Sequence, residues 1–261
     1  MAAALTFRLI GEGIAYSASP AMMTAAFEAL ALPHRYVLAD VPRSEVAATV
    51  ALLRAADAGG ANVTVPHKAA VAALVDEVSD VAREADAVNT VVRDGAQLIG
   101  HNTDMPATIE ALERLCPDGV SHAVLIGAGG VSRAIQLALA KVGAGRVTVL
   151  RRSDGSIQRL AEELASADLL INATPVGTGS DESLVPAAQL RPDLAVLDLV
   201  YRPSPTRLVR EARAAGAPAE ARAALLLGQA WRSHELWVGR TAPVARMRAA
   251  LDAELGASTD V

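Results

Sequence analysis

Two hydroxyl side chains, Ser17 and Ser19, stand at the start of a predicted helix over 19–32, where they could bind a carboxylate. A helix N-terminus presents unpaired N–H groups and the positive end of the helix dipole, and both favour an anion. Ser19 is expected to be the N-cap, with Pro20 at the first helical position. Ser17 has no capping role that the sequence assigns, which leaves its hydroxyl for a ligand.

Other polar residues stand at the ends of predicted strands. Thr64 lies near the end of the strand 61–66, and Lys68 follows that strand. A hairpin is predicted over 87–102, with its turn at Asp94-Gly95; Asn89 lies near its start, and Asp104 follows its end. Each has an ordinary explanation when taken alone. A lysine on a first helical turn is usually solvated, and Asp104 could cap a helix that begins at Met105.

A glycine-rich segment, Gly127-Ala128-Gly129-Gly130, joins an apolar strand over 122–127 to a helix that ends near 143. Gly127 permits a tight turn, Gly129 lets the backbone approach a pyrophosphate, and helix N–H groups from Gly130 onward point at the anion. Ser132 replaces the third glycine of the usual pattern, so the strand and helix on either side carry the prediction. The alternative is a plain tight turn.

The residues after the next strand, 146–150, predict which dinucleotide binds. An acidic residue here usually binds the ribose of NAD, but this chain has Arg151-Arg152-Ser153. Two guanidinium groups and a hydroxyl suit a 2′-phosphate through charge-assisted hydrogen bonds. NADP is therefore expected, with NAD possible because Asp154 follows. A solvated basic corner is the alternative.

Strands alternate with helices along most of the chain, which is typical of an α/β fold with a parallel-rich sheet. The short segment 151–170 leaves only seventeen residues between the strand 146–150 and the strand 168–174, which is room for one helix over about 156–166. We expect a single crossover, without an extra strand, that returns beside 122–127 on its other side. The remaining expected strands are 6–11, 34–40 and 195–201, and the remaining expected helices are 44–57, 67–78, 105–115, 205–216 and two within 221–256.

Composition excludes several classes of protein. Hydrophobic residues make up 52% of the chain and the net charge is −5, which argues against disorder and against a nucleic-acid surface. No apolar run approaches the ~20 residues of a membrane span, and Arg8 interrupts the start, so no signal peptide is expected. The single Cys116 excludes an intrachain disulfide, and the five histidines lack zinc spacing. We expect a cytoplasmic protein, monomeric or homodimeric, without a metal, acting on a small molecule.

Taken together, these segments resemble the shikimate dehydrogenase family over nearly the whole chain, in the family's order. The matching motifs are Ser17-x-Ser19-Pro20, Asn62-Val63-Thr64-x-Pro66-x-Lys68, Ala87-Val88-Asn89-Thr90, Asn102-Thr103-Asp104, Gly127-x-Gly129-Gly130-x-x-Arg133-Ala134, Asn172-Ala173-Thr174-Pro175-x-Gly177, Asp198-x-x-Tyr201 and Gln229-Ala230.

The resemblance implies an oxidoreductase that interconverts 3-dehydroshikimate and shikimate. A substrate-binding α/β domain with a mainly parallel sheet would comprise 1–104 and 225–261, and a doubly wound Rossmann-like NADP domain 105–224. Lys68 and Asp104 would be the catalytic pair, since a lysine beside a carboxylate can pass a proton to and from an alcohol oxygen. Ser17, Ser19 and Tyr201 would bind the substrate carboxylate, and Thr64, Asn89, Asp104 and Gln229 its hydroxyls. The cofactor would contact Gly127, Gly129, Gly130, Arg133, Arg151, Arg152, Ser153 and Thr174.

The chain departs from the family pattern at three places, so a divergent member is expected. Met105-Pro106 follows Asp104 where the family usually has glycine, Ala221-Arg222-Ala223-Ala224 replaces a glycine-containing stretch, and the segment 151–170 is short. Quinate or a modified shikimate are alternative substrates. A methylenetetrahydrofolate dehydrogenase shares the two-domain layout but would not have the paired serines. A non-catalytic ligand sensor would be expected to lack Lys68 or Asp104, and both are present.

Overall fold

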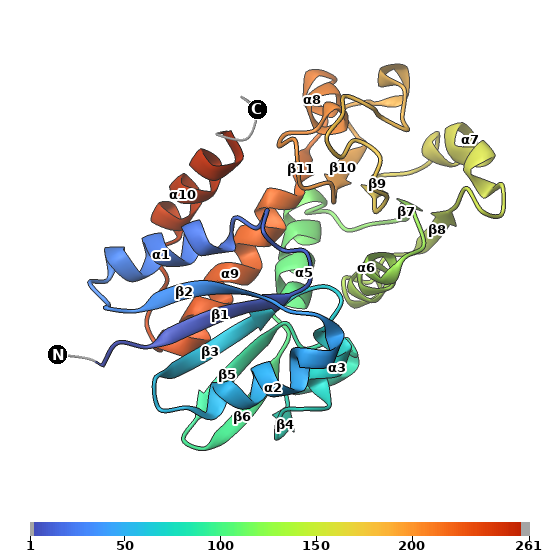
Figure 1. The fold of residues 1–261 in the computed structure, drawn as a ribbon. Helices are drawn as coiled ribbons and strands as arrows, with labels where there is room; N and C mark the ends of the chain where they lie inside the picture. The colour runs from blue at the N-terminus through green and yellow to red at the C-terminus, as the bar shows by residue number, and fades with distance from the viewer. Residues whose placement is uncertain (1–2, 257–261) are drawn as a thin grey trace. The chain divides into compact units, whose positions relative to one another are not determined.

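The computed structural model describes residues 3–256, and this part of the chain divides into two units (Figure 1). Unit 1 contains the residues up to Pro106 together with Leu226–Glu254. Unit 2 contains Ala107–Leu225 and, at the end of the described residues, 255–256. The chain therefore leaves unit 1 after Pro106 and returns to it along one long helix, α9 (Arg222–Val238).

Unit 1 is built on a mixed sheet with the strand order β2-β1-β3-β5-β6-β4. β1 is parallel to β2 and β3, β5 is antiparallel to β3 and β6, and β4 is parallel to β6. The hairpin predicted around Asp94-Gly95 is confirmed as β5 and β6. The strands are β1 (Thr6–Gly11), β2 (Arg35–Asp40), β3 (Ala58–Val63), β4 (Glu77–Val78), β5 (Thr90–Asp94) and β6 (Gln97–His101).

Helices cover both faces of this sheet. On one face an aliphatic cluster joins Val46, Val50 and Val71 to Ile10 and Val63 of the strands. On the other face the ring of Phe7 packs against those of Phe27 and Trp237, at centroid distances of 5.1 and 4.8 Å. The helices are α1 (Ser19–Ala29), α2 (Val46–Ala51) between the 3-10 turns η1 (Arg43–Glu45) and η2 (Leu52–Arg54), α3 (Lys68–Ala72), α4 (Asp80–Glu84), α9 and α10 (Val244–Gly256).

Unit 2 contains an all-parallel sheet with the strand order β11-β10-β9-β7-β8. Every residue of β7, β9 and β10 is buried, as expected of parallel strands covered on both faces. The strands are β7 (His122–Ile126), β8 (Arg146–Leu150), β9 (Leu169–Asn172), β10 (Ala195–Asp198) and β11 (Ala219–Ala221). The predicted α/β class with a Rossmann-like unit is confirmed.

The crossover after β8 is a single helical segment, as predicted. The 3-10 turn η3 (Ser156–Arg159) runs directly into α7 (Leu160–Leu164), and the chain returns as β9 on the side of β7 opposite β8. The order reverses between β7 and β9, which makes this the topological switch point where parallel α/β sheets bind ligands. The other helices are α5 (Asp104–Leu115), α6 (Gly130–Lys141), η4 (Ala187–Gln189) and α8 (Arg207–Ala214).

The helix predicted over 67–78 is wrong beyond Ala72. Asp76 leaves the helical path because its N–H donates to Leu98 O at 2.9 Å, while its carboxylate accepts the Leu98 N–H at 2.7 Å. These contacts lead the chain into β4. The short strand β11 was also not predicted, because its alanine-rich sequence carries no strand signal. Within residues 3–256, no helix is both long and apolar enough to span a membrane.

Candidate active site

Lys68 and Asp104 are brought together in unit 1. Lys68 begins α3, Asp104 begins α5, and Nζ of the lysine lies 2.6 Å from Oδ2 of the aspartate. Their side chains are 31% and 39% exposed, so the pair is accessible to a ligand. The capping role suggested for Asp104 is filled instead by Asn102, whose Oδ1 accepts the Met105 N–H at 2.9 Å. The Asp104 carboxylate is therefore directed to the lysine.

The segment 87–90 fixes the backbone on both sides of the pair. The Val88 N–H donates to Lys68 O at 3.1 Å. Asn89 binds Thr103 twice, since its Oδ1 accepts the Thr103 N–H at 2.7 Å and its Nδ2 donates to Thr103 Oγ1 at 3.0 Å. Thr103 directly precedes Asp104, so Asn89 holds the point from which the carboxylate projects. The Asn89 side chain is 2% exposed.

A buried polar network connects α9 to the sheet, and we call it the Ser233 network. Its centre is Ser233, whose Oγ accepts from Asn62 Nδ2 at 2.9 Å and donates to Gln229 O at 3.0 Å. Ser233 was not singled out from the sequence. Its spacing of four residues from Gln229, which places both on one helix face, was the available signal. The network consists of Asn62, Asn89, Thr90, Thr103 and Ser233.

The side-chain hydrogen bond at the start of α1 comes from Ser17 and not from Ser19. The helix α1 begins at Ser19, its N-cap residue is Ala18, and no side chain caps that position. Ser17 Oγ instead accepts the Ser19 N–H at 3.2 Å. The prediction that Ser19 is the N-cap is wrong, because the hydroxyl two residues earlier reaches the first unpaired N–H. Ser17 keeps its own hydroxyl proton for donation to a ligand.

The remaining predicted substrate ligands lie in different units. Thr64 directly follows β3 and is half-buried. Gln229 lies on α9 one turn before Ser233, and its Nε2 donates to Leu226 O at 2.8 Å. Tyr201 belongs to unit 2, where it is half-buried three residues after the end of β10.

The glycine segment of unit 2 forms the turn between β7 and α6. The first position of this turn accepts only glycine. Gly127 has a φ of +112°, and a Cβ there would lie 2.8 Å from Ala173 O, at the end of β9. A Cβ on Gly129 would meet nothing within 4 Å, so the space above the helix N-terminus at Gly130 is open. Ser132 replaces the third glycine without strain, because its hydroxyl donates to Gly127 O at 2.9 Å. Arg133 follows on the exposed side of the helix.

Arg151, Arg152 and Ser153 are exposed in a closed turn after β8. Asp154 Oδ1 accepts from the Ser156 hydroxyl at 2.6 Å and from its N–H at 2.9 Å, and the Ser156 Oγ accepts the Arg151 N–H at 2.8 Å. The hydrogen bond from the Ser156 hydroxyl lowers the pKa of Asp154 below its usual range, and the hydrogen bond from the Ser156 N–H adds to this effect. Asp154 therefore stabilises the turn that carries the arginines.

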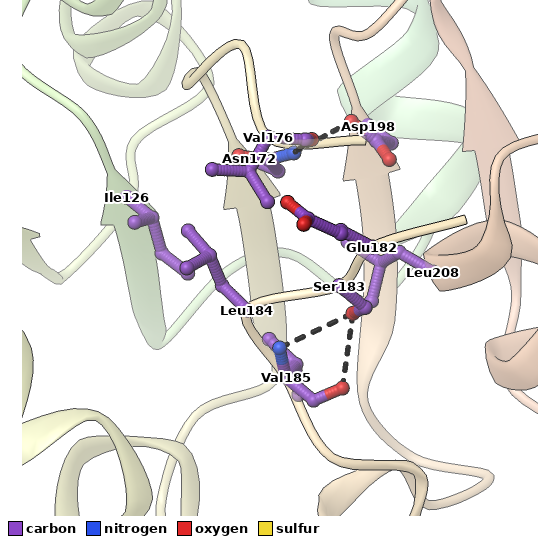
Figure 2. Close-up of a pocket in the computed structure, with 9 residues that line it drawn as sticks. All are labelled: Ile126, Asn172, Val176, Glu182, Ser183, Leu184, Val185, Asp198 and Leu208. Atoms are coloured by element: carbon purple, nitrogen blue, oxygen red, sulfur yellow. Dashed lines mark hydrogen bonds between the residues drawn. The ribbon is translucent and has the colours of Figure 1, made fainter. Parts of the chain in front are cut away.

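Thr174 is held at the end of β9 by Asn172, whose Oδ1 accepts from its hydroxyl at 2.7 Å. Asn172 Nδ2 in turn donates to Asp198 Oδ1 at 2.9 Å, and burial raises the pKa of Asp198. Asn172 and Asp198 line a hollow together with the segment 182–185, and Figure 2 shows the Glu182 carboxylate turned into it. Among residues 3–256, no group of three His, Cys, Asp or Glu side chains could hold a metal ion.

A parallel sheet with a glycine turn at its switch point, in a chain whose other unit carries a partly exposed Lys–Asp pair, is typical of a dinucleotide-dependent oxidoreductase. Comparison with known proteins identifies the family. The family model described as the shikimate dehydrogenase substrate binding domain matches residues 9–91, and the one described as the shikimate 5′-dehydrogenase C-terminal domain matches 225–251. The chain belongs to the shikimate dehydrogenase family, because relatives that are 38% and 40% identical match 95% and 93% of it.

Individual relatives match nearly the full length. The chain is 38% identical to the NADP-dependent shikimate dehydrogenase of Symbiobacterium thermophilum, over 95% of this chain and 93% of the relative. It is 40% identical to that of Methanopyrus kandleri, over 93% of each. The shikimate 5-dehydrogenase of Thermus thermophilus, solved with NADP(H) and shikimate, superposes with a TM-score of 0.83 at 36% identity, covering 96% of this chain and 100% of that one. The quinate dehydrogenase of Corynebacterium glutamicum, solved with NAD, gives 0.84 at 30% identity, covering 96% and 99%.

Proposed function

We propose that this protein interconverts 3-dehydroshikimate and shikimate with NADP as its cofactor. The observation that carries the proposal is the 2.6 Å contact between Lys68 Nζ and Asp104 Oδ2, in a chain of the shikimate dehydrogenase family. The reaction transfers one proton and one hydride between a ring alcohol and a ketone. The proton needs a side-chain donor that can also act as an acceptor.

Lys68 performs the proton transfer. In the reduction, its ammonium donates a proton from Nζ to the ketone oxygen as the carbon–oxygen double bond becomes a single bond, and the resulting amine regains a proton from water. In the oxidation, the hydroxyl proton passes to the neutral amine. Asp104 orients Nζ and stabilises its positive charge. The nicotinamide, when bound, supplies the hydride to the ring carbon or accepts it.

Substrate recognition is assigned to hydroxyl and amide groups. Ser17, Ser19 and Tyr201 bind the carboxylate, supported by the free hydroxyl proton of Ser17 at the start of α1. Thr64, Asn89 and Gln229 bind the ring hydroxyls, together with Asp104. The order of these groups along the chain is the order expected from the family motifs.

The residues of unit 2 fit a dinucleotide. Gly127, Gly129, Gly130 and Arg133 hold the pyrophosphate, and the open space over Gly129 beside an uncapped helix N-terminus is what an anion requires. Thr174 follows β9, the strand that borders the switch point opposite β7. The exposed guanidinium groups of Arg151 and Arg152, with Ser153, bind the 2′-phosphate, which favours NADP over NAD.

Quinate is the second candidate substrate, because one of the similar structures is a quinate dehydrogenase. A ligand sensor without activity is disfavoured by the intact Lys68–Asp104 pair. The proposal includes a cytoplasmic location, which the single cysteine suits because that compartment is reducing. It also includes a monomer or a homodimer.

The test is a matrix of initial rates followed at the absorbance of the reduced nicotinamide. Purified protein is assayed with shikimate or quinate, each with NADP⁺ or NAD⁺. The highest kcat/KM is expected for shikimate with NADP⁺. A higher kcat/KM for quinate would assign the second candidate, and no oxidation of either acid would overturn both.

A further inference from the structure

Ser233 takes no part in the proposed reaction, yet the segments that carry the predicted site residues converge on it. Its side chain is fully buried, and its Oγ lies 2.8 Å from Thr90 Oγ1 and 3.1 Å from Thr103 Oγ1. Thr103 directly precedes Asp104. The same Oγ binds the carbonyl of Gln229, one turn earlier on α9. One hydroxyl therefore joins the strand end before Asp104 to the helix that carries Gln229.

The hydrogen-bonding capacity of this hydroxyl is fully used. A serine hydroxyl has one proton and two lone pairs. The proton goes to Gln229 O, one lone pair accepts from Asn62 Nδ2 at 2.9 Å, and the other faces the threonine hydroxyls. Asn62 is itself fixed, because its Oδ1 accepts from Tyr36 OH at 2.8 Å. A side chain without the hydroxyl would remove one hydrogen bond from Asn62 Nδ2, from Gln229 O and from the threonine hydroxyls, and the network would have to rearrange.

We propose that Ser233 is a positioning residue, which sets the Asp104 carboxylate against Lys68 and places Gln229 relative to both. The inference rests on the proposed function, because it assigns the pair to proton transfer and Gln229 to the substrate. Small displacements of a catalytic group lower the rate strongly, and about 1 Å can cost about 100-fold. The contacts lie entirely in unit 1, whereas the predicted cofactor residues lie in unit 2.

The expected effects therefore separate substrate from cofactor. Ser233→Ala should lower kcat for shikimate oxidation about 5- to 20-fold and raise KM for shikimate about 3- to 10-fold, within the range that a misplaced group produces. KM for NADP⁺ should stay within about twofold. Ser233→Cys keeps a weak donor and acceptor and should fall between wild type and Ser233→Ala.

Thr49→Val is the matched control. Thr49 is also a buried helical hydroxyl that binds the carbonyl four residues earlier, with Oγ1 2.9 Å from Glu45 O, but it lies on α2. A purely structural role for Ser233 would make both substitutions lower Tm without moving the kinetic constants. A positioning role also predicts that Ser233→Ala changes kcat by less than about twofold in an Asp104→Asn background, because the positioned group is already lost.

The test is steady-state kinetics with shikimate and NADP⁺ for wild type, Ser233→Ala, Ser233→Cys, Thr49→Val, Asp104→Asn and the double variant Ser233→Ala, Asp104→Asn. The inference is supported if Ser233→Ala loses kcat and shikimate affinity only when Asp104 is present, and if Ser233→Cys is intermediate. It is overturned if Ser233→Ala or, should that variant not fold, Ser233→Cys matches Thr49→Val in every constant. Absence of shikimate oxidation by the wild type would overturn the proposed function instead.

Discussion

Lys68 is one of very few lysines in a chain whose basic side chains are almost all arginines. The sequence contains 22 arginines and only two lysines, Lys68 and Lys141. A guanidinium stays protonated in proteins, whereas an ammonium can give up its proton. A chain that uses arginine almost everywhere, but lysine beside Asp104, has the residue type that proton transfer requires. The scarcity of lysine therefore also indicates a special role for Lys68, independently of the motif in which it lies.

Asp104 is expected to act through the lysine. Asp104→Asn removes the negative charge 2.6 Å from Nζ while keeping the side-chain shape, so kcat for shikimate oxidation should fall about 10- to 100-fold, as for loss of an electrostatic partner. KM for NADP⁺ should remain within about threefold. Asp57→Asn, an exposed aspartate of the same unit, is the control in steady-state assays. Wild-type kcat in Asp104→Asn would remove the carboxylate from the mechanism.

Ser17 and Ser19 are expected to differ in a way that the structure, not the sequence, predicts. Ser17→Ala should raise KM for shikimate more than it lowers kcat, because it removes binding shared by ground and transition states. It should also cost about 0.5–2 kcal/mol of stability, as loss of a helix cap does, because the Ser19 N–H loses its acceptor. Ser19→Ala should show the KM effect alone. Denaturant unfolding of both variants checks the assignment, and a greater loss of stability in Ser19→Ala would reverse it.

Among the elements, the turn after β8 is expected to set cofactor preference. Arg151 and Arg152 are exposed, and Asp154 is bound within the turn to Ser156. Wild type should prefer NADP⁺ over NAD⁺ by about 10- to 100-fold in kcat/KM, since each ~1.4 kcal/mol is a factor of ten. The double substitution Arg151→Ala, Arg152→Ala should abolish most of this preference while leaving NAD⁺ activity.

Two further variants control this prediction. Arg159→Ala, an arginine of the same crossover that is paired with Glu163, should leave the ratio within about twofold. Ser156→Ala should release Asp154 toward the ribose and lower the preference. A preference for NAD⁺ in the wild type would show that the arginine pair does not bind the 2′-phosphate.

Local patterns predicted the elements that depend on few distant contacts. The β7–turn–α6 unit, the hairpin β5–β6 and the single crossover through α7 follow from glycine positions, apolar runs and chain length. The segment 73–78 could not be predicted, because Asp76 leaves the helical path only through its contacts with Leu98. β11 likewise exists through its pairing with β10. Tertiary pairing overrode local propensity at both places.

The same limit applies to the site. The identities of Lys68 and Asp104 could be predicted from motifs, but the Ser233 network joins residues 62, 90, 103 and 233, which no local pattern connects. The hydrogen bond from the Ser19 N–H to Ser17 Oγ depends on the residue at which α1 begins, which the sequence did not predict closely enough. The role of a residue could therefore be predicted where it belongs to a sequence motif. It could not be predicted where it depends on a buried hydrogen bond between distant segments.

At the scale of the whole molecule, a buried histidine is expected to make folding sensitive to acid. His234 is fully buried beside the ring of Phe27, and both of its ring nitrogens lack a hydrogen-bond partner in residues 3–256. Burial lowers the pKa of His234 to about 4, with the nearby charges of Glu235 and Arg240 as smaller influences. The unfolded chain, with a histidine pKa near 6.5, binds the proton more readily. Stability is therefore lost as pH falls from about 6.5 toward 4.

The expected size of this loss is about 2 kcal/mol between pH 7 and pH 5, from the difference between the two pKa values. His234→Phe should remove that share, because an apolar ring suits the same aromatic surroundings. Urea unfolding of both proteins at the two pH values measures it. An equal loss in wild type and His234→Phe would mean that His234 is not the group responsible.

Lys68 is proposed to move the proton in shikimate oxidation, and kcat with shikimate and NADP⁺ tests this role most directly. Lys68→Ala should lower kcat by 100-fold or more while KM for shikimate stays within about tenfold, as loss of a general acid–base group does. Lys68→Arg should be impaired to a similar degree, because it keeps the charge without a transferable proton. Lys141→Arg, the same change at the other lysine, should keep wild-type kcat. Wild-type kcat in Lys68→Ala, or in Lys68→Arg, would contradict the account.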